Sequence, residues 1–255
     1  MPQVILITGV SSGFGKATAE VLASKGYTVY GTSRKPVDHP LPYHLISMDV
    51  TDEQSVTTAV AQVINAEGKI DVLINNAGMG IGGALENFSS EETQKQFDVN
   101  FFGMARVVRM VLPYMRARKS GKIVNVSSVG GLMGLPFQGH YSAAKFAVEG
   151  YSEALSIEVK PFKIQVVVVN PGDFRTGFTS SRIFTKKDMA GTDYDLFFHK
   201  AIPVIEKDEQ GGYYPVVLAN TMAKIVRKKN PHYRYIVGRL DQRFISRLKP
   251  FLRMA

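Results

Sequence analysis

The chain has 255 residues, of which 45% are hydrophobic and 21% charged, as in a globular protein with a substantial apolar core. It contains no cysteine, which excludes disulfides, thiolate metal sites and cysteine nucleophiles. The five histidines show no metal-ligand spacing, so we expect no metal site. The N-terminus lacks a signal-peptide pattern, and no apolar run approaches the roughly 18 residues of a membrane span. We therefore expect a soluble, cytoplasmic protein.

Residues 3–8 form a continuous apolar run, which predicts a strand buried on both faces of a parallel sheet. A glycine-rich turn follows, and then a helix predicted over residues 16–24. Strand, glycine turn and helix together indicate a dinucleotide site, because glycines let the backbone approach a pyrophosphate whose charge the helix N-terminus stabilises. An ordinary tight turn is the alternative interpretation. The cofactor residues expected here are Gly9, Ser11, Ser12, Gly13, Phe14 and Gly15.

The second predicted strand, residues 27–32, is followed by Ser33, Arg34 and Lys35. An NAD-binding protein would place a carboxylate near this position to bind the adenosine ribose, and none is present. A guanidinium here can instead pair with a 2′-phosphate. The sequence therefore predicts that NADP(H) binds in preference to NAD(H), with Ser33 and Arg34 in contact with it. A solvated basic turn is the alternative.

The next two predicted strands, residues 43–48 and 70–75, also end in polar or glycine-containing turns. Asp49-Val50 follows the first, and Asn76-Ala77-Gly78 follows the second. Between them Thr51 is expected to cap a helix that runs to about residue 66.

After a loop at residues 79–90, we expect a long helix over residues 91–118 with Asn100 in its middle. Asparagine is a mediocre helix residue, which suggests a purpose for Asn100 beyond helix propensity. A polar helix face would also explain it.

A fifth strand is predicted at residues 122–126, before Ser127 and Ser128, and a sixth at residues 164–170. Between them lies a helix-forming segment that contains Tyr141 and Lys145. Because residues four apart share one helical face, the ammonium would lie beside the phenol, favour its ionised form and lower its pKa. This spacing alone is weak, since such pairs often form a solvated helix face.

Strands and helices alternate along the chain, which predicts a single Rossmann-type α/β domain over residues 1–255, with a doubly wound parallel sheet of about seven strands. A further helix at 216–228 and a closing strand at 233–237 complete it. Ligands bind beyond the carboxyl ends of such strands, and every motif above follows a strand.

Two segments lie outside this alternation. Residues 176–215 are rich in aromatic side chains, and they predict either a substrate lid or a small helical insertion with an aromatic core.

The formal net charge is +9, and all of the excess lies in the last 36 residues, which carry 10 Lys and Arg and one acid. In the basic tail, residues 240–255, apolar residues at helical spacing are typical of a membrane-surface helix, although Pro250 would break it. Packing on the subunit is the favoured alternative. We expect no nucleic-acid partner, because charge is present without a recognition element.

The motifs in their order and spacing resemble the short-chain dehydrogenase/reductase family over nearly the whole chain. They are most similar to the branch of estradiol 17-beta-dehydrogenase and the retinol dehydrogenases. The family's usual Ile or Val is replaced by Phe174. The matching motifs are Thr8-Gly9-x-x-x-Gly13-x-Gly15, Asn75-Asn76-Ala77-Gly78, Asn100, Ser128, Tyr141-x-x-x-Lys145 and Pro171-Gly172-x-x-x-Thr176.

The resemblance implies roles for four catalytic residues. Tyr141 would be the general acid or base, and Lys145 would hold the nicotinamide ribose and lower the pKa of the tyrosine. Ser128, thirteen residues before Tyr141, would position the substrate oxygen, and Asn100 would fix a water that links Lys145 to solvent. The resemblance adds Pro171, Gly172, Phe174 and Thr176 to the cofactor residues, and it implies a homodimer or homotetramer.

We expect the substrate to be a hydrophobic ketone or aldehyde, or the matching alcohol, because apolar residues separate Ser128 from Tyr141. The expected pocket residues are Met133, Leu135, Phe137 and Phe178. The function predicted is therefore NADP(H)-dependent carbonyl reduction or alcohol oxidation. An alternative is a catalytically idle NADP(H)-sensing or scaffolding protein, which would be expected to have lost one of the four catalytic residues.

Overall fold

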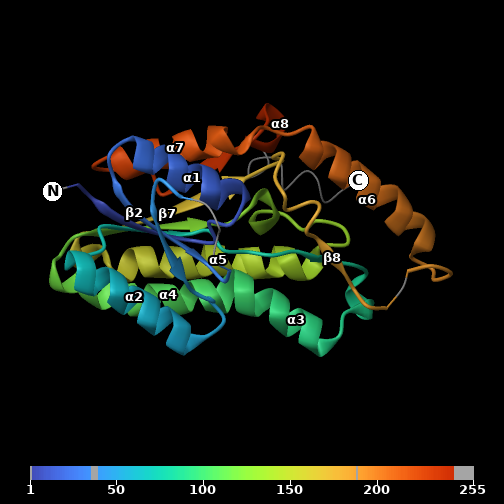
Figure 1. Cartoon of the computed structure of the whole chain (residues 1–255). Coiled ribbons are helices and arrows are strands. Elements are labelled where there is room, and N and C mark those ends of the chain that lie inside the picture. The colour runs from blue at the N-terminus through green and yellow to red at the C-terminus, as the bar shows by residue number, and fades with distance from the viewer. Residues whose placement is uncertain (1, 36–39, 188, 244–255) are drawn as a thin grey trace.

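A parallel sheet of seven strands forms the centre of this computed structural model, which describes residues 2–35, 40–187 and 189–243 (Figure 1). The strand order is β3-β2-β1-β4-β6-β7-β9, and each neighbouring pair is parallel. The predicted doubly wound sheet of about seven strands is therefore confirmed. The strands are β1 Val4–Thr8, β2 Thr28–Ser33, β3 His44–Ser47, β4 Val72–Asn75, β6 Gly121–Val126, β7 Ile164–Pro171 and β9 Arg234–Val237.

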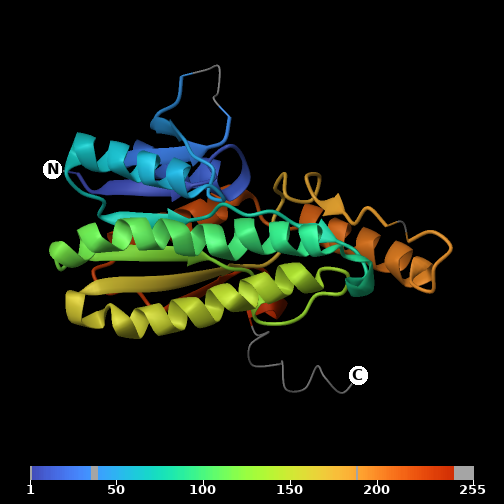
Figure 2. The same ribbon diagram turned by 90° about the horizontal axis from the view of Figure 1, so that it is seen from below.

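Helices cover both faces of the sheet (Figures 1 and 2). On one face lie α1 Gly13–Ser24 and α7 Pro215–Arg227. On the other lie α2 Glu53–Glu67, α4 Gly103–Ala117 and α5 Gly139–Glu158.

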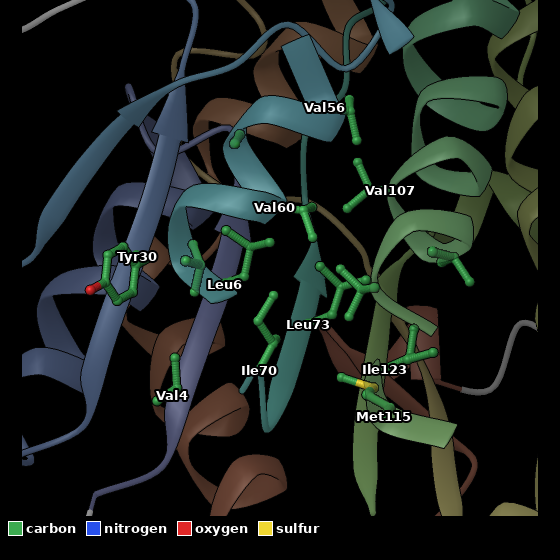
Figure 3. Packing of buried hydrophobic residues seen from close by; sticks show 14 of the residues in the cluster. Val4, Leu6, Tyr30, Val56, Val60, Ile70, Leu73, Val107, Met115 and Ile123 are labelled. Atoms are coloured by element: carbon green, nitrogen blue, oxygen red, sulfur yellow. The ribbon is translucent and has the colours of Figure 1, made fainter. Parts of the chain in front are cut away.

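Strand β1 is apolar throughout because its side chains alternate between the two faces of the sheet, and each face packs against its own hydrophobic core. Val4 and Leu6 pack with Val60 and Leu73 on the face of α2 and α4, as Figure 3 shows. Ile5 and Ile7 enter the core beneath α1 and α7.

Two local expectations about helices were wrong. Helix α2 is capped by Asp52, whose carboxylate accepts hydrogen bonds from the backbone N–H groups of Gln54 and Ser55, while Thr51 donates its hydroxyl to Asp49. The helix expected over residues 91–118 is divided into α3 Ser90–Phe97, a π-helical turn Asp98–Phe102 and α4. A π turn within a helix often marks a functional position, and Asn100 lies in this one.

The segment 176–215 extends beyond the carboxyl ends of the strands (Figure 1). It contains β8 Ile183–Phe184, which pairs in parallel with β5 Ile81–Gly82, and the long helix α6 Asp195–Gln210. This small second sheet joins the loop after β4 to the segment after β7. Short 3₁₀ helices complete the description, at Leu85–Asn87, Val129–Gly131 and Lys160–Phe162.

At the C-terminus, α8 Leu240–Arg243 follows β9. Its Gln242 side chain accepts a hydrogen bond from the backbone N–H of Asp173, just after β7. The rest of the basic tail, residues 244–255, lies outside the described residues. Within the described ranges no helix combines the length and the apolar character that a membrane crossing requires.

A buried lysine joins the sheet to the end of α7. The ammonium of Lys122, on β6, donates to the carbonyls of Ile225, Val226 and Lys228, each at 2.8 Å. The carbonyls of Ile225 and Val226 belong to the last turn of the helix, and Lys228 is its C-cap residue, so none of the three has an intrahelical donor. Burial lowers the pKa of Lys122 to about 8, which still leaves the ammonium charged at neutral pH.

Replacing this lysine should destabilise the fold. We expect Lys122→Met to lower the free energy of unfolding by about 1.5–3 kcal/mol, because three buried carbonyls lose a charged donor. Urea unfolding at pH 7 measures the change. The control is Lys224→Met on α7, where the lysine is exposed, and it should change the free energy of unfolding by less than about 0.5 kcal/mol. Equal losses in the two variants would contradict this function of Lys122.

Candidate active site

A cavity of about 380 Å³ opens at the carboxyl ends of the strands. Such a volume lies in the range of small-molecule sites. All four predicted catalytic residues line it, as do all the predicted cofactor residues except Gly15. Its lining also includes Leu135 and Phe178, two of the predicted substrate residues, but it includes neither Met133 nor Phe137. The structure therefore brings together predicted residues that are far apart in the sequence, from Gly9 to Phe178.

The glycine turn after β1 is shaped by close backbone contacts. Gly9 has φ +72°, and a Cβ there would lie 2.9 Å from Cα of Ala77. A Cβ on Gly15 would lie 2.1 Å from the carbonyl oxygen of Gly9, so this glycine allows α1 to pack on the turn rather than lining the cavity. Ser12, at the N-cap of α1, makes no capping hydrogen bond with its side chain. The first N–H groups of the helix are thus free of a competing cap beside the cavity.

The turn is tied to the loop after β4 by the side chains of Thr8 and Asn76. The amide of Asn76 donates to the carbonyls of Thr8 and Gly9 at 3.0 and 2.9 Å. The hydroxyl oxygen of Thr8 accepts from the backbone N–H of Asn76 and of Ala77, both at 2.9 Å. Two neighbouring strand ends therefore hold each other in a fixed shape.

The end of β2 carries no carboxylate. Ser33 is buried, and its hydroxyl accepts from the backbone N–H of Lys35 at 3.2 Å. Arg34 and Lys35 are exposed and line the cavity. The nearby Asp49 is already engaged by the N–H and hydroxyl of Thr51 at 2.9 and 2.8 Å. This end of the cavity therefore presents positive charge.

Asn100 points from the π turn to the loop after β4. Its amide donates to the carbonyls of Met79 and Gln96, both at 2.9 Å, and its oxygen accepts from the N–H of Met79 at 3.2 Å. Gln96 donates to the same Met79 carbonyl at 2.9 Å. A Cβ on Gly78 would lie 2.9 Å from the Asn100 oxygen and 3.8 Å from Nζ of Lys145. Asn100 and Gln96 therefore position the backbone that borders the lysine.

Ser128 and Tyr141 lie close together in the cavity lining, because a Cβ on Gly130 would lie 3.4 Å from both the hydroxyl oxygen of Ser128 and Cε1 of Tyr141. Burial raises the pKa of Tyr141 to about 12, while the Ser128 hydroxyl acts in the opposite direction. The sequence-based expectation that the pKa of Tyr141 would be lowered is therefore wrong, because desolvation of the phenolate is the largest effect and the charge of Glu209 adds to it. The phenol remains protonated at neutral pH.

Lys145 lies one helical turn after Tyr141 on α5, with its Nζ 5.7 Å from the centroid of the tyrosine ring. The ammonium donates to the carbonyl of Val126 at 3.0 Å. Burial lowers the pKa of Lys145 to about 8, and the charge of Glu149 opposes this shift. The predicted neighbourhood of the two side chains is thus present on the helix, with the lysine still charged at pH 7.

A buried polar network supports these residues from behind. The amide of Asn170, at the end of β7, donates to the carbonyl of Ser128 at 2.9 Å and to Glu149 at 2.6 Å. Glu149 is also paired with Arg234 of β9 at 2.8 Å. The neighbouring Ser127 donates its hydroxyl to the backbone carbonyl of Lys145 at 3.4 Å. Of the two serines, Ser128 is therefore the one directed at Tyr141.

Aromatic side chains form the wall opposite the glycine turn. The ring of Phe178 lies 5.6 Å from that of Tyr141, measured between centroids. Phe174 packs edge-on against Phe14 at 4.9 Å, so both belong to the cofactor end of the cavity. Phe137 instead packs against Phe198 of α6 at 5.3 Å, which places its ring under the helix and not in the cavity lining.

Residues of the irregular segment also reach the cavity, and sequence reasoning missed them. Glu209, near the end of α6, lines it together with Thr179. The charge of Glu209 acts on Tyr141 strongly enough to raise its pKa further. No motif or spacing marks these positions. The only sequence signal for them is that they lie in the aromatic-rich segment 176–215, which follows the last motif of the site.

The fold and the residues around this cavity define a class of protein, the oxidoreductases built on a Rossmann-type sheet. The chain belongs to the short chain dehydrogenase family, whose model matches residues 3–187.

Three relatives show where in this family the chain lies. It is 52% identical over 251 residues to a 3-ketodihydrosphingosine reductase of Bacteroides thetaiotaomicron, covering 98% of this chain and 93% of the relative. An NADPH-dependent 3-dehydrocapnine reductase of Ornithobacterium rhinotracheale is 31% identical, covering 91% and 87%. Human retinol dehydrogenase 8 is 39% identical over 209 residues, covering 75% of this chain and 66% of the relative. The resemblance to the retinol dehydrogenase branch is thus confirmed.

A solved structure supports the same assignment. A short-chain dehydrogenase from Streptomyces avermitilis is 33% identical and superimposes with a TM-score of 0.86, covering 98% of this chain and 93% of the other. The fold of the chain is therefore that of the family.

Proposed function

We propose that the protein is an NADP(H)-dependent reductase of a long-chain ketone, with Tyr141 as its general acid. The observation that carries this proposal is the pairing of Ser128 with Tyr141, one helical turn from Lys145, in the cavity that the glycine turn also lines. A proton donor, a fixed hydroxyl and a fixed positive charge are what the reduction of a carbonyl requires.

The residues around the cavity fit a nicotinamide dinucleotide. Gly9 and Gly13 have positive φ, which makes the turn narrow, and the first turn of α1 has neither an acidic residue nor a side-chain cap to compete with a phosphate. When bound, the cofactor supplies the hydride. Arg34 and Lys35 favour a cofactor that carries a 2′-phosphate. The NADPH dependence named for the Ornithobacterium relative supports the same choice.

In the proposed reaction Tyr141 gives its proton to the carbonyl oxygen as the carbonyl carbon is reduced to an alcohol. Ser128 holds that oxygen through its hydroxyl. The Lys145 ammonium binds the nicotinamide ribose and offsets the negative charge that forms on the phenolate. Asn100 fixes the backbone at Met79 beside this ammonium. Its further role, holding a water that returns protons to Lys145, is also part of the proposal.

The substrate that we propose is 3-ketodihydrosphingosine or a close analogue. This compound has a ketone next to an amine-bearing carbon, and a long alkyl chain on the other side of the carbonyl. The relative of that name matches nearly the whole chain at 52% identity. Leu135 and Phe178 offer apolar surface beside Tyr141 for the alkyl chain. Retinoids and steroids are less favoured, because the relatives named for retinol share less sequence.

We propose that residues 176–215 serve as a substrate lid. The segment is attached to the domain at β8, where the N–H groups of Ile183 and Thr185 donate to the carbonyls of Gly80 and Gly82 at 3.0 Å each. It also carries exposed apolar residues on α6, namely Leu196, Phe197 and Val204. A lid of this kind would exclude water from the reacting carbonyl.

A homo-oligomer, as the family resemblance implies, is also part of the proposal. Large apolar side chains are exposed on the π turn and on α4 and α5, two helices of the same face of the sheet (Figure 2). Contact with a second subunit would remove this surface from water. The residues are Phe102, Tyr114, Phe146 and Ile157.

Substituting Arg34 tests the cofactor choice. We expect Arg34→Ala to reduce kcat/KM for NADPH by roughly 10- to 100-fold, because a charged hydrogen bond to the 2′-phosphate is lost. The value for NADH should stay unchanged, since that cofactor lacks the phosphate. Initial rates with both cofactors measure the effect. A proportional loss with NADH would contradict the proposed contact.

Replacing Tyr141 tests the chemistry. Tyr141→Phe should lower kcat for ketone reduction by about 10²–10⁴-fold, since it removes the proton donor. Fluorescence titration should still show NADPH binding. Tyr151→Phe is the control, because Tyr151 lies on the same helix but outside the cavity lining. Undiminished reduction by Tyr141→Phe would refute its role as the acid.

The lowered pKa of Lys145 predicts a pH profile. We expect kcat/KM for NADPH, which reports the free enzyme, to be constant below about pH 8 and to fall above it as the ammonium loses its proton. Glu149→Gln removes a charge that raises this pKa, so the fall should begin at a lower pH. The exposed Glu153 of the same helix gives the control Glu153→Gln. Identical profiles for all three proteins would contradict the assignment.

A further inference from the structure

A single carboxylate on the substrate side of the cavity has no assigned task. Among the described residues, the acidic side chains that line the cavity are Asp49, Asp173 and Glu209. Asp49 lies after β3 among the predicted cofactor residues, and Asp173 lies after β7, where it accepts from the amide of Gln242. Glu209 comes from α6, and its charge acts directly on Tyr141. It is therefore the acid that a substrate at Tyr141 would meet.

Glu209 is held in a defined position from behind. One of its oxygens accepts from the guanidinium of Arg182, and the other accepts from the hydroxyl of Thr179 at 2.7 Å. The side chain of Arg182 is 0% exposed and that of Glu209 is 15% exposed, so the guanidinium is sealed while part of the carboxylate still reaches the cavity. The guanidinium also lies over the ring of Phe178, at 5.9 Å, which ties the pair to the wall beside Tyr141.

The positive charge of Arg182 is smaller than the total negative charge of the two carboxylates beside it, Glu206 and Glu209. Its guanidinium lies 3.8 Å from a second carboxylate, Glu206, so two acids share one base. Asp173 reports the same excess of negative charge: burial raises its pKa most, and the charges of Asp208 and Glu209 raise it further. A cation entering this corner would therefore be stabilised.

We propose that Glu209 binds an ammonium group on the substrate, next to the carbonyl that Tyr141 protonates. This inference rests on the proposed function, and it makes an α-amino ketone the preferred class over an uncharged long-chain ketone. A positive charge at Glu209 also cancels part of the field that holds the proton on Tyr141. The substrate's own ammonium thus eases the transfer of that proton to its carbonyl oxygen.

The test compares two ketones of the same chain length, 3-ketodihydrosphingosine and the same 1-hydroxy-3-ketone without the amine. The wild-type protein should prefer the amino ketone in kcat/KM with NADPH. Glu209→Gln should lower kcat/KM for the amino ketone by roughly 10- to 100-fold, because a charge-assisted hydrogen bond is lost. The affinity for NADPH should not change. The value for the amine-free ketone should not fall, because that substrate has no ammonium to lose, and removing the carboxylate charge lowers the pKa of Tyr141.

Asp208→Asn is the matched control. Asp208 is the neighbouring acid on α6 and does not line the cavity, so its loss removes the same unit of charge without touching the substrate. The control should keep the preference for the amino ketone. A Glu209→Gln variant that keeps the preference, or a control that loses it as fully, would overturn the subsite.

A second variant covers the case in which Glu209→Gln unfolds the segment by leaving Arg182 unpaired. Arg182→Met combined with Glu209→Gln removes both charges, and it should reduce the amine-free ketone and show no preference for the amine. A preference retained by this double variant would overturn the inference. Wild-type protein that reduces neither ketone with NADPH would overturn the proposed function as well, whereas wild-type activity with an unaffected Glu209→Gln variant overturns the subsite alone.

Discussion

Burial of a parallel sheet on both faces is the constraint on which the rest of this molecule depends. The central strands β1, β4, β6 and β7 are buried between the helix layers, so the polar groups that can reach a ligand lie beyond the strand ends. Because all seven strands run in the same direction, their carboxyl ends meet at one edge. The glycine turn, the Asn76 loop, Ser128 and the residues after β7 are therefore neighbours, although they lie far apart in the sequence.

The chemistry at that edge needs a second layer of buried polar groups. Asn170 holds the carbonyl of Ser128 and the carboxylate of Glu149, and Glu149 in turn is paired with Arg234. Such a network stabilises a site only when its members are satisfied together. It also links the end of β7, the middle of α5 and the start of β9. The positions of Ser128 and Lys145 are thus set by strands that contribute nothing to the reaction directly.

Much of this arrangement could be predicted from the sequence, because it depends on local signals that repeat. Apolar runs marked the strands, and the turns after them marked the site. The π turn at Asn100 could not be predicted, since it accompanies tertiary hydrogen bonds of Asn100 and Gln96 to Met79 that no local pattern marks. Asp52 rather than Thr51 caps α2 because Thr51 is engaged by Asp49. The place of Glu209 in the site could not be predicted, because only tertiary contacts bring the end of α6 to the cavity that Tyr141 lines.

The expected effect of Lys145 on Tyr141 failed for a different physical reason. Burial penalises the phenolate, the charge of Glu209 adds to this penalty, and the pKa of Tyr141 rises to about 12. The same burial lowers the pKa of Lys145 to about 8. At neutral pH the site therefore holds a protonated phenol beside an ammonium.

That combination suits reduction, in which the phenol must lose its proton only as charge develops on the carbonyl oxygen. The ammonium gains little from a neutral phenol 5.7 Å away, measured to the ring centroid, but it attracts the phenolate once the proton has moved. The low-dielectric surroundings that make the free phenolate costly also strengthen this attraction. In the proposed reduction the interaction would thus be stronger in the transition state than in the ground state, which is the condition for lowering the barrier.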